Sequence, residues 1–282
     1  MNWSVALRLG RVSNLPTVTS NVLAGIALAG AHPPTLHIVI VCVAMSMMYV
    51  AGMYLNDAFD REIDAVERPE RPIPAGLVTA RTVFDIGFGL LGGGLVLVAA
   101  LALLTGTGWS AVLSMTALGS LILLYDSNHK LNALSPLIMG LCRAAVYVTA
   151  ALAVSRELPP GVLIGAGCLV AYLIGLTYIA RQENLRSMSS WWPVAFLAVP
   201  FVVTVPHGLV PTLLYLGFLV WVARSLALLR ARNIREAVTS LIAGISLLDA
   251  VFILREGRPT LAVIAIAAWL LTKALQRYVP GT

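Results

Sequence analysis

Long apolar segments, separated by short polar ones, run through most of this chain. A helix of about 20 apolar residues is long enough to cross the hydrocarbon core of a membrane. The pattern predicts ten such helices, at 14–31, 36–56, 80–104, 108–125, 134–154, 160–180, 192–206, 208–230, 236–254 and 259–277. The seventh is short and lies next to the eighth, so nine or ten spans are expected. The ninth carries Asp249 and several Ser and Gly residues, which favours an interfacial or strongly tilted helix.

The composition agrees with this pattern. Of the 282 residues, 59% are hydrophobic and 11% are charged, whereas an ordinary soluble domain is about 25% charged. We therefore predict an all-α, polytopic membrane helical bundle, with residues 1–282 forming a single integral-membrane domain. Polar residues such as Ser13, Asn14, Ser20 and Asn21 interrupt the first apolar segment, which indicates a retained first helix rather than a signal peptide.

The basic residues flank the apolar segments and do not form a stripe that would bind nucleic acid. When the loops are assigned alternately to the two sides, fifteen of the 19 Lys and Arg residues fall on the side of the N-terminus. Only Arg156, Arg255 and Arg258 fall on the opposite side, and Arg143 lies within a span. Because cytoplasmic loops carry an excess of Lys and Arg, we expect a multi-pass protein of the cytoplasmic membrane with a cytoplasmic N-terminus.

Acidic residues are concentrated in one segment on the predicted cytoplasmic side. The stretch "NDAFDREIDAVERPERPIPAG" (residues 56–76) holds six of the 13 acidic residues of the chain. Asn56, Asp60 and Asp64 are spaced four residues apart, which places them on one face of a helix, and Asp57 lies near the edge of that face. Like charges at this spacing repel each other. Mg²⁺ would relieve the repulsion, because it prefers oxygen ligands and commonly takes one or two carboxylates plus substrate phosphates.

Two interpretations of this segment remain open from spacing alone. The acids can belong to a solvated loop, in which they pair with Arg61, Arg68 and Arg71. Alternatively, Arg68 and Arg71, on the proline-stiffened loop "RPERPIPAG", clamp phosphate oxygens after the metal binds. Acids for a metal, bases for a diphosphate and an apolar interior for a lipid tail would then form one site.

Three segments resemble a known family. N-D-x-x-D-x-x-x-D followed by R-P-x-P-x-G resembles the first signature of the UbiA superfamily of intramembrane prenyltransferases. "RVSNLPTVTSNVLAG" (11–25) and "LLYDSNHK" (123–130) resemble its first helix and its tyrosine-to-lysine segment. The resemblance extends from about residue 8 to 186. It implies about nine helices around a central cavity open to the membrane, and Mg²⁺-dependent transfer of a prenyl group from its diphosphate to a lipophilic or aromatic acceptor.

The resemblance also implies roles for individual residues. Asn56, Asp60 and Asp64, with Asp57 beside them, would hold the metal. Arg68, Arg71 and Lys130 would contact the diphosphate, and Tyr125 would line the cavity nearby. Asn14 and the intramembrane Arg143 are further candidates for substrate contacts, since an ionisable residue at membrane depth is a functional candidate. Asp249 is expected to be structural. The residues expected to take a direct part in catalysis are Asp60, Asp64, Tyr125 and Lys130.

The family normally has a second aspartate-rich motif after the sixth helix, and here the chain departs from the pattern. "GLTYIARQENLRSM" (175–188) contains one carboxylate, Glu183, with Asn184 beside it and Arg181 nearby. Three readings stay open: Glu183 and Asn184 hold a weaker second Mg²⁺, Arg181 replaces the charge of that ion, or only binding remains. "YIARQEN" resembles a small branch of the family associated with Ebo-type gene clusters.

A weak internal repeat keeps a second class of function open, a non-catalytic UbiA-like lipid or small-molecule binding protein or a transporter. The expected partners are a prenyl diphosphate, a lipophilic acceptor and membrane lipids, with no nucleic acid. The sequence does not determine the prenyl length, the acceptor or the oligomeric state. A glycine-rich stretch, "GFGLLGGG" (87–94), lies within an apolar helix and lacks the features of a phosphate loop. It predicts close packing between helices.

Overall fold

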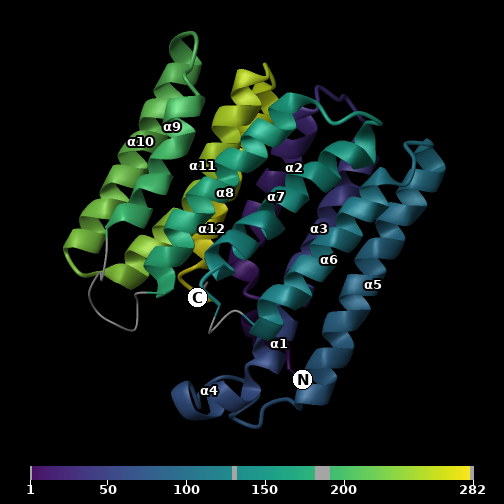
Figure 1. The fold of residues 1–282 in the computed structure, drawn as a ribbon, viewed down its shortest axis with the longest axis vertical. Helices are drawn as coiled ribbons and strands as arrows, with labels where there is room; N and C mark the ends of the chain where they lie inside the picture. The colour runs from purple at the N-terminus through teal and green to yellow at the C-terminus, as the bar shows by residue number, and fades with distance from the viewer. Residues whose placement is uncertain (1, 129–131, 182–190, 280–282) are drawn as a thin grey trace.

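The fold is known from a computed structural model, which describes residues 2–128, 132–181 and 191–279. In these residues every regular element is a helix, as the composition predicts (Figure 1). The elements are α1 (Trp3–Leu9), the 3₁₀ helix η1 (Val12–Asn14), α2 (Leu15–Leu28), α3 (Thr35–Phe59), α4 (Arg61–Glu67), α5 (Ala80–Thr105), α6 (Ser110–Asn128), α7 (Ser135–Val154), α8 (Pro160–Arg181), the 3₁₀ helix η3 (Trp192–Ala198), α9 (Val199–Val203), α10 (Leu209–Arg230), α11 (Ile234–Arg255) and α12 (Pro259–Leu275).

Each predicted apolar segment contains a helix, but the helices differ in length. Within the described residues, seven are long and apolar enough to cross a membrane: α3, α5, α6, α7, α8, α10 and α11. The protein is therefore an integral membrane protein. α2 has 14 residues and α12 has 17, and the seventh predicted segment is a 3₁₀ turn followed by the five-residue α9. The total of nine or ten spans stays a prediction.

The glycine-rich stretch of α5 packs closely against α3, as predicted. A Cβ atom at Gly87 would lie 2.7 Å from Cγ of Leu55, and one at Gly94 would lie 3.1 Å from the carbonyl oxygen of Ala44. Any larger residue at these positions would push α5 away from α3. Small residues thus allow the close approach of two membrane helices, and α3 is the helix that leads into the acidic segment.

The helix α11 is the most buried of the candidate spans, so the prediction of an interfacial helix is wrong. Its most apolar window is 83% buried, whereas the corresponding window of α10 is 22% buried. It packs against α2, α8, α10 and α12. The prediction relied on Asp249, a charged residue that was expected to need water. In the structure its carboxylate instead accepts hydrogen bonds from three protein side chains, Ser20, Asn21 and Tyr147. A carboxylate satisfied in this way does not need to face water, and Asp249 is structural, as expected.

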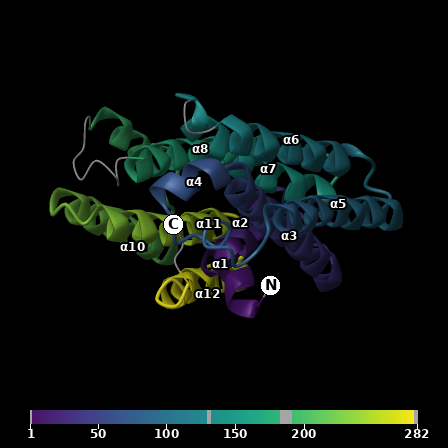
Figure 2. The same cartoon turned by 90° about the horizontal axis from the view of Figure 1, so that it is seen from below.

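The acidic segment lies at one end of the bundle. Figure 1 places α1, α4 and both labelled ends of the chain there, and Figure 2 views the molecule from that end. The turn between α10 and α11 and the last turn of α12 lie at the same end. Two of the basic residues that the sequence assigned to the side of the N-terminus, Arg11 and Arg71, contact an acidic residue of this segment directly. That this end faces the cytoplasm stays a prediction.

Candidate functional site

Four polar residues around the junction of α3 and α4 form a buried cluster, the acidic cluster: Asn56, Asp57, Asp60 and Asp64. Hydrogen bonds from the Asp60 amide to the Asn56 carbonyl (3.0 Å) and from the Asp64 amide to the Asp60 carbonyl (2.8 Å) carry the helical register across the junction. Asp60 has a ψ of −3°, against about −42° in a regular helix, so the chain bends there. Asn56, Asp57, Asp60 and Asp64 are 2–7% exposed. Such burial does not fit a solvated loop.

Two arginines bind this cluster. Arg71 donates from Nη1 to Oδ2 of Asp64 (2.7 Å) and to Oδ1 of Asp57 (3.2 Å). Arg11 donates from Nη2 to Oδ1 of Asp57 and to Oδ1 of Asn56, each at 3.4 Å. Arg71 was predicted as a site residue from the sequence, and its partners are the acids themselves. The open interpretation in which arginines pair with the acids is thus right about Arg71 and about Arg61, which pairs with the exposed Glu62 at 2.8 Å. It is wrong about solvation for Asp57, Asp60 and Asp64, which are buried.

Arg11 was not predicted from the sequence as an individual site residue. It lies between α1 and η1 in the left-handed region of the backbone, with a φ of 41°, where non-glycine residues are uncommon and often functional. Burial is the largest single influence and lowers the pKa of Arg11, but the attractions of Asp57, Tyr49, Tyr125 and Asp126 together outweigh it, so the pKa lies above its ordinary value. The available signal was its position at the start of the segment that resembles the first helix of the family.

A second missed residue is Asp126 of α6, which brings a further carboxylate to the cluster. It is 5% exposed and accepts a hydrogen bond from Nδ2 of Asn56 at 3.3 Å. Its other oxygen, Oδ2, is buried and has no hydrogen-bond partner among the described residues. Buried polar atoms are normally paired, and perturbed or unsatisfied ones gather at functional sites. The signal was its place next to Tyr125 in "LLYDSNHK".

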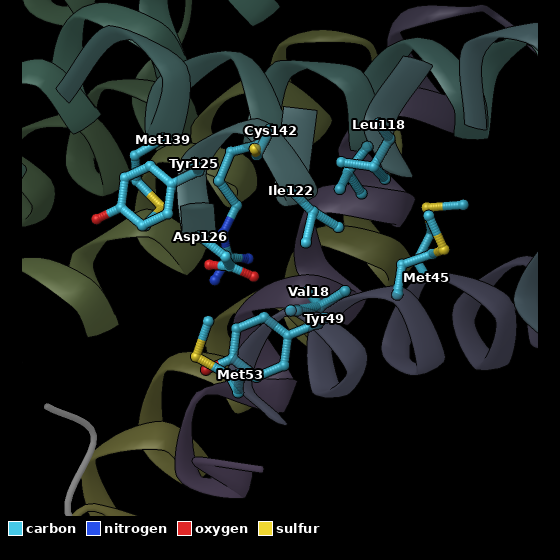
Figure 3. Close-up of a pocket in the computed structure, with 14 residues that line it drawn as sticks. Val18, Met45, Tyr49, Met53, Leu118, Ile122, Tyr125, Asp126, Met139 and Cys142 are labelled. Atoms are coloured by element: carbon cyan, nitrogen blue, oxygen red, sulfur yellow. The ribbon is translucent and has the colours of Figure 1, made fainter. Parts of the chain in front are cut away.

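Behind the cluster, an apolar pocket of about 90 Å³ lies between α2, α3, α6 and α7. Asp126 and Tyr125 lie at one end of the labelled lining residues, and Met45 and Leu118 lie at the other (Figure 3). Four methionines contribute to the lining: Met45, Met48, Met53 and Met139. The volume of this pocket is smaller than the roughly 300–1,000 Å³ of typical ligand sites. Methionine side chains, however, are flexible and can repack around a ligand.

Arg143 also lines this pocket, as the sequence suggested. It donates to Oδ1 of Asn21 at 2.8 Å, and its guanidinium lies 5.3 Å from the centre of the Tyr49 ring. Asn21 in turn donates to the carboxylate of Asp249. Arg143 thus lies in the pocket wall and is also anchored within the bundle by its hydrogen bond to Asn21.

The other predicted residues lie around this centre or outside the described residues. Asn14 is buried and accepts a hydrogen bond from Nε2 of Gln276 at 3.4 Å. Arg68 is half-buried at the end of α4. Arg181 is exposed and binds the start of α7 through Oγ of Ser135 at 3.2 Å. Three predicted site residues lie outside the described residues, namely Lys130, Glu183 and Asn184.

The donor set of the cluster suits Mg²⁺, which is bound by hard oxygen ligands. The candidate ligands are Asn56, Asp57, Asp60, Asp64 and Asp126. The unpartnered oxygen of Asp126 supports this fit. In the part of the chain that the structure describes, however, no three His, Cys, Asp or Glu side chains already converge in the way a bound ion requires. Arg71 instead supplies positive charge to Asp57 and Asp64.

The fold and this cluster define a class: polytopic helical membrane proteins with a buried acidic site next to an apolar pocket. The chain belongs to the UbiA prenyltransferase family, whose family model matches residues 18–281. The family resemblance that the acidic motif suggested is thereby confirmed.

Individual relatives match over shorter segments. The chain is 34% identical over 125 residues to the chloroplastic chlorophyll synthase of Avena sativa. The matched segment covers 43% of this chain and 33% of that protein. The chain is 36% identical over 128 residues to the digeranylgeranylglyceryl phosphate synthase of Pyrococcus horikoshii, which covers 44% of this chain and 43% of that protein. The matched segments span less than half of either relative.

Solved structures share the fold over nearly the whole chain. A structure of digeranylgeranylglyceryl phosphate synthase superimposes with a TM-score of 0.61 at 19% identity, covering 93% of this chain and 98% of that one. A UbiA homologue from Archaeoglobus fulgidus, bound to GPP and Mg²⁺, superimposes with a TM-score of 0.55 at 13% identity, covering 96% and 99%. The all-helical UbiA-like fold is therefore confirmed.

Proposed function

We propose that this protein transfers a prenyl group from a prenyl diphosphate to a lipophilic acceptor in the membrane, using Mg²⁺ and releasing diphosphate. The observation that carries the proposal is the buried acidic cluster, bordered by Arg11 and Arg71, at one end of an apolar pocket. Family membership supports it. So do the Archaeoglobus fulgidus homologues, which were solved with GPP or DMAPP and Mg²⁺.

In this proposal the oxygen atoms of Asn56, Asp60 and Asp64 would hold the metal, with Asp57 and Asp126 beside them. When bound, Mg²⁺ neutralises charge on the diphosphate and makes it a better leaving group. The bond between the first prenyl carbon and the diphosphate breaks, and both electrons leave with the diphosphate. The allylic carbon gains cationic character until the acceptor bonds to it and loses a proton.

Arg71 has two sets of partners in this mechanism. Without substrate it pairs with Asp57 and Asp64. If a cation were held by these carboxylates, the guanidinium of Arg71 would be free to bind phosphate oxygens, which match its planar set of donors. The residue thus neutralises the acids before substrate arrives and the diphosphate afterwards. Arg68 and Lys130 are proposed as further phosphate contacts.

The apolar pocket is proposed to hold the prenyl chain. It starts at Asp126, so a chain inside it has its diphosphate end at the acidic cluster. Its apolar walls exclude water, which would otherwise capture the allylic cation. Because four methionines line it, we expect the walls to rearrange when a chain enters. Tyr125 and Arg143 also line this pocket.

The test is metal-dependent release of diphosphate. Purified protein is mixed with prenyl diphosphates of graded length, Mg²⁺ and a membrane lipid extract that supplies the acceptor. We expect Asp60→Asn and Asp64→Asn to lower turnover by about 100-fold or more, because they remove charge that binds the metal directly. Asp85→Asn, at an exposed acid of α5, is the matched control and should retain full activity.

The assay also separates the proposal from its alternative. A non-catalytic binding protein or a transporter would retain prenyl lipids without releasing diphosphate at any chain length. Full activity in both acidic variants would overturn the assignment of the metal site.

A further inference from the structure

A second hollow, of about 600 Å³, lies at the end of the bundle that holds α4 and both ends of the chain. It is formed by the last turns of α10 and α12 and the first turns of α11, which packs against both of them. It shares no lining residue with the apolar pocket. The lining residues are Trp221, Arg224, Asn233, Arg235, Glu236, Thr239, Ser240, Trp269, Leu270, Lys273, Gln276 and Arg277. Its volume falls in the range of ligand sites.

The walls of this basic pocket carry a large excess of positive charge. Four cations, Arg224, Arg235, Lys273 and Arg277, face one carboxylate, Glu236. Glu236 itself accepts a hydrogen bond from Nδ2 of Asn233 at 2.6 Å. Among the described residues, none of the four cations forms an ion pair. Cations gathered in one hollow repel each other and raise the local concentration of anions.

Other features of the basic pocket add polar groups and an apolar side. The indole nitrogen Nε1 of Trp269 and the side-chain oxygen Oε1 of Gln276 are buried without a partner in the described part of the chain. The rings of Trp221 and Trp269 pack edge to face, with their centroids 4.9 Å apart. Leu270, beside them, is 57% exposed. Tryptophan is enriched where membrane helices meet the headgroup region, so the apolar side of the pocket is placed for an acyl chain.

We propose that this basic pocket binds the phosphate headgroup of an anionic membrane phospholipid, with its acyl chains against Trp269 and Leu270. Basic pockets between membrane helices bind such headgroups. Free phosphate shares the headgroup chemistry but cannot use the apolar side. Gln276, which lines the basic pocket, also donates a hydrogen bond to Oδ1 of Asn14. Asn14 belongs to η1, the 3₁₀ helix that directly follows Arg11, so the proposed lipid site is connected to the segment that positions Arg11. The inference does not rest on the proposed transferase activity.

Thermal unfolding of delipidated protein in a neutral detergent tests the proposal. Phosphatidylglycerol, phosphatidylcholine and inorganic phosphate are added separately to wild type and two triple variants. One variant, Arg235→Gln/Lys273→Gln/Arg277→Gln, removes three charges from the pocket. The matched control, Arg81→Gln/Arg230→Gln/Arg232→Gln, removes three charges from outside it.

We expect phosphatidylglycerol to raise the unfolding temperature of wild type and control by several degrees, since a ligand that binds only the folded state stabilises it. The pocket variant should lose this shift, and phosphatidylcholine should produce none. Native mass spectrometry should show one anionic lipid retained by wild type and control only. If the triple variant does not fold, Lys273→Gln alone should raise the lipid concentration needed for half the shift by at least fivefold.

Three results would overturn the proposal. An equal shift with inorganic phosphate would show that the pocket binds phosphate without lipid. An equal loss in the control variant would show that only general surface charge matters. The same shift in the pocket variant as in wild type would show that the lipid binds elsewhere.

Discussion

Two buried carboxylates of this protein, Asp126 and Asp249, have opposite surroundings. Both are at most 5% exposed. Asp249 accepts hydrogen bonds from three side chains on α2 and α7. Within the described part of the chain, Asp126 accepts one, from Asn56, and its Oδ2 has no partner. A satisfied buried carboxylate stabilises the fold, whereas an unsatisfied one destabilises it and indicates a site for a ligand.

Replacing Asp126 should weaken the affinity for Mg²⁺ without lowering the stability of the metal-free protein. Asp126→Asn replaces a buried carboxyl group whose Oδ2 has no hydrogen-bond partner among the described residues, so the unfolding temperature in EDTA should not fall. The Mg²⁺ concentration that gives half of the maximal stabilisation should rise by about tenfold, because a ligand oxygen loses its charge. Thermal unfolding across a Mg²⁺ titration measures both quantities. An unchanged Mg²⁺ response would remove Asp126 from the metal site.

Asp249→Asn should show the reverse behaviour. An amide at this position leaves some of the donors of Ser20, Asn21 and Tyr147 unpaired, and each buried unpaired group costs about 1–3 kcal/mol. The unfolding temperature should fall, while the Mg²⁺ concentration for half-maximal stabilisation stays the same. Denaturant unfolding in detergent gives the loss of stability. A shifted Mg²⁺ response in this variant would mean that the network around Arg143 reaches the metal.

At the scale of elements, α3 connects the acidic cluster to the pocket. Asn56 and Asp57, near the end of α3, belong to the acidic cluster. Met45, Met48 and Met53 of the same helix line the apolar pocket. The close packing of α5 through Gly87 and Gly94 holds α3 on its other side. If the pocket holds the prenyl chain as proposed, its length along α3 sets how long a chain fits between the acidic end and Met45.

Met45→Ala should consequently change the preferred chain length. The side chain is fully buried at the end of the pocket away from Asp126, and its removal opens space for about one more isoprene unit. We expect turnover to shift toward longer prenyl diphosphates, at a loss of about 2–5 kcal/mol of stability. Competition between diphosphates of graded length measures the shift. Met47→Ala is the control, because Met47 lies against Gly93 of α5 and not in the pocket. An unchanged preference would place the prenyl chain elsewhere.

At the scale of the whole molecule, charge is distributed unevenly between the two ends. The acidic cluster, its two arginines and the basic pocket all lie at the end shared by α4 and the chain termini. The positive-inside rule assigns this end to the cytoplasm. A water-soluble diphosphate and an anionic lipid leaflet would then be met on the same side of the membrane.

Cysteine labelling tests this orientation. The native cysteines, Cys42, Cys142 and Cys168, are first replaced by alanine. Single cysteines at Val66 and Tyr278, which are 84% and 83% exposed, should react with an impermeant reagent only from the cytoplasmic side. A cysteine at Trp109, between α5 and α6, should react only from the other side. If Val66 and Tyr278 were labelled from opposite faces, the shared-end arrangement would be contradicted.

The sequence by itself determined the class of protein and the centre of the site. Apolar segment length predicts membrane helices because lipid leaves few alternatives for the backbone, and the four-residue spacing of Asn56, Asp60 and Asp64 places them together by local geometry alone. Both properties depend only on residues close together in the chain.

Only the tertiary structure decided how these local elements are combined. Asn56 meets Asp126 across 70 residues, and Ser20 meets Asp249 across 229. Helical periodicity shows which face of a helix is apolar but not which helix covers it, so neither the burial of α11 nor the roles of Arg11 and Asp126 followed from the sequence. The basic pocket likewise forms only where the ends of α10 and α12 meet the start of α11 at one end of the bundle.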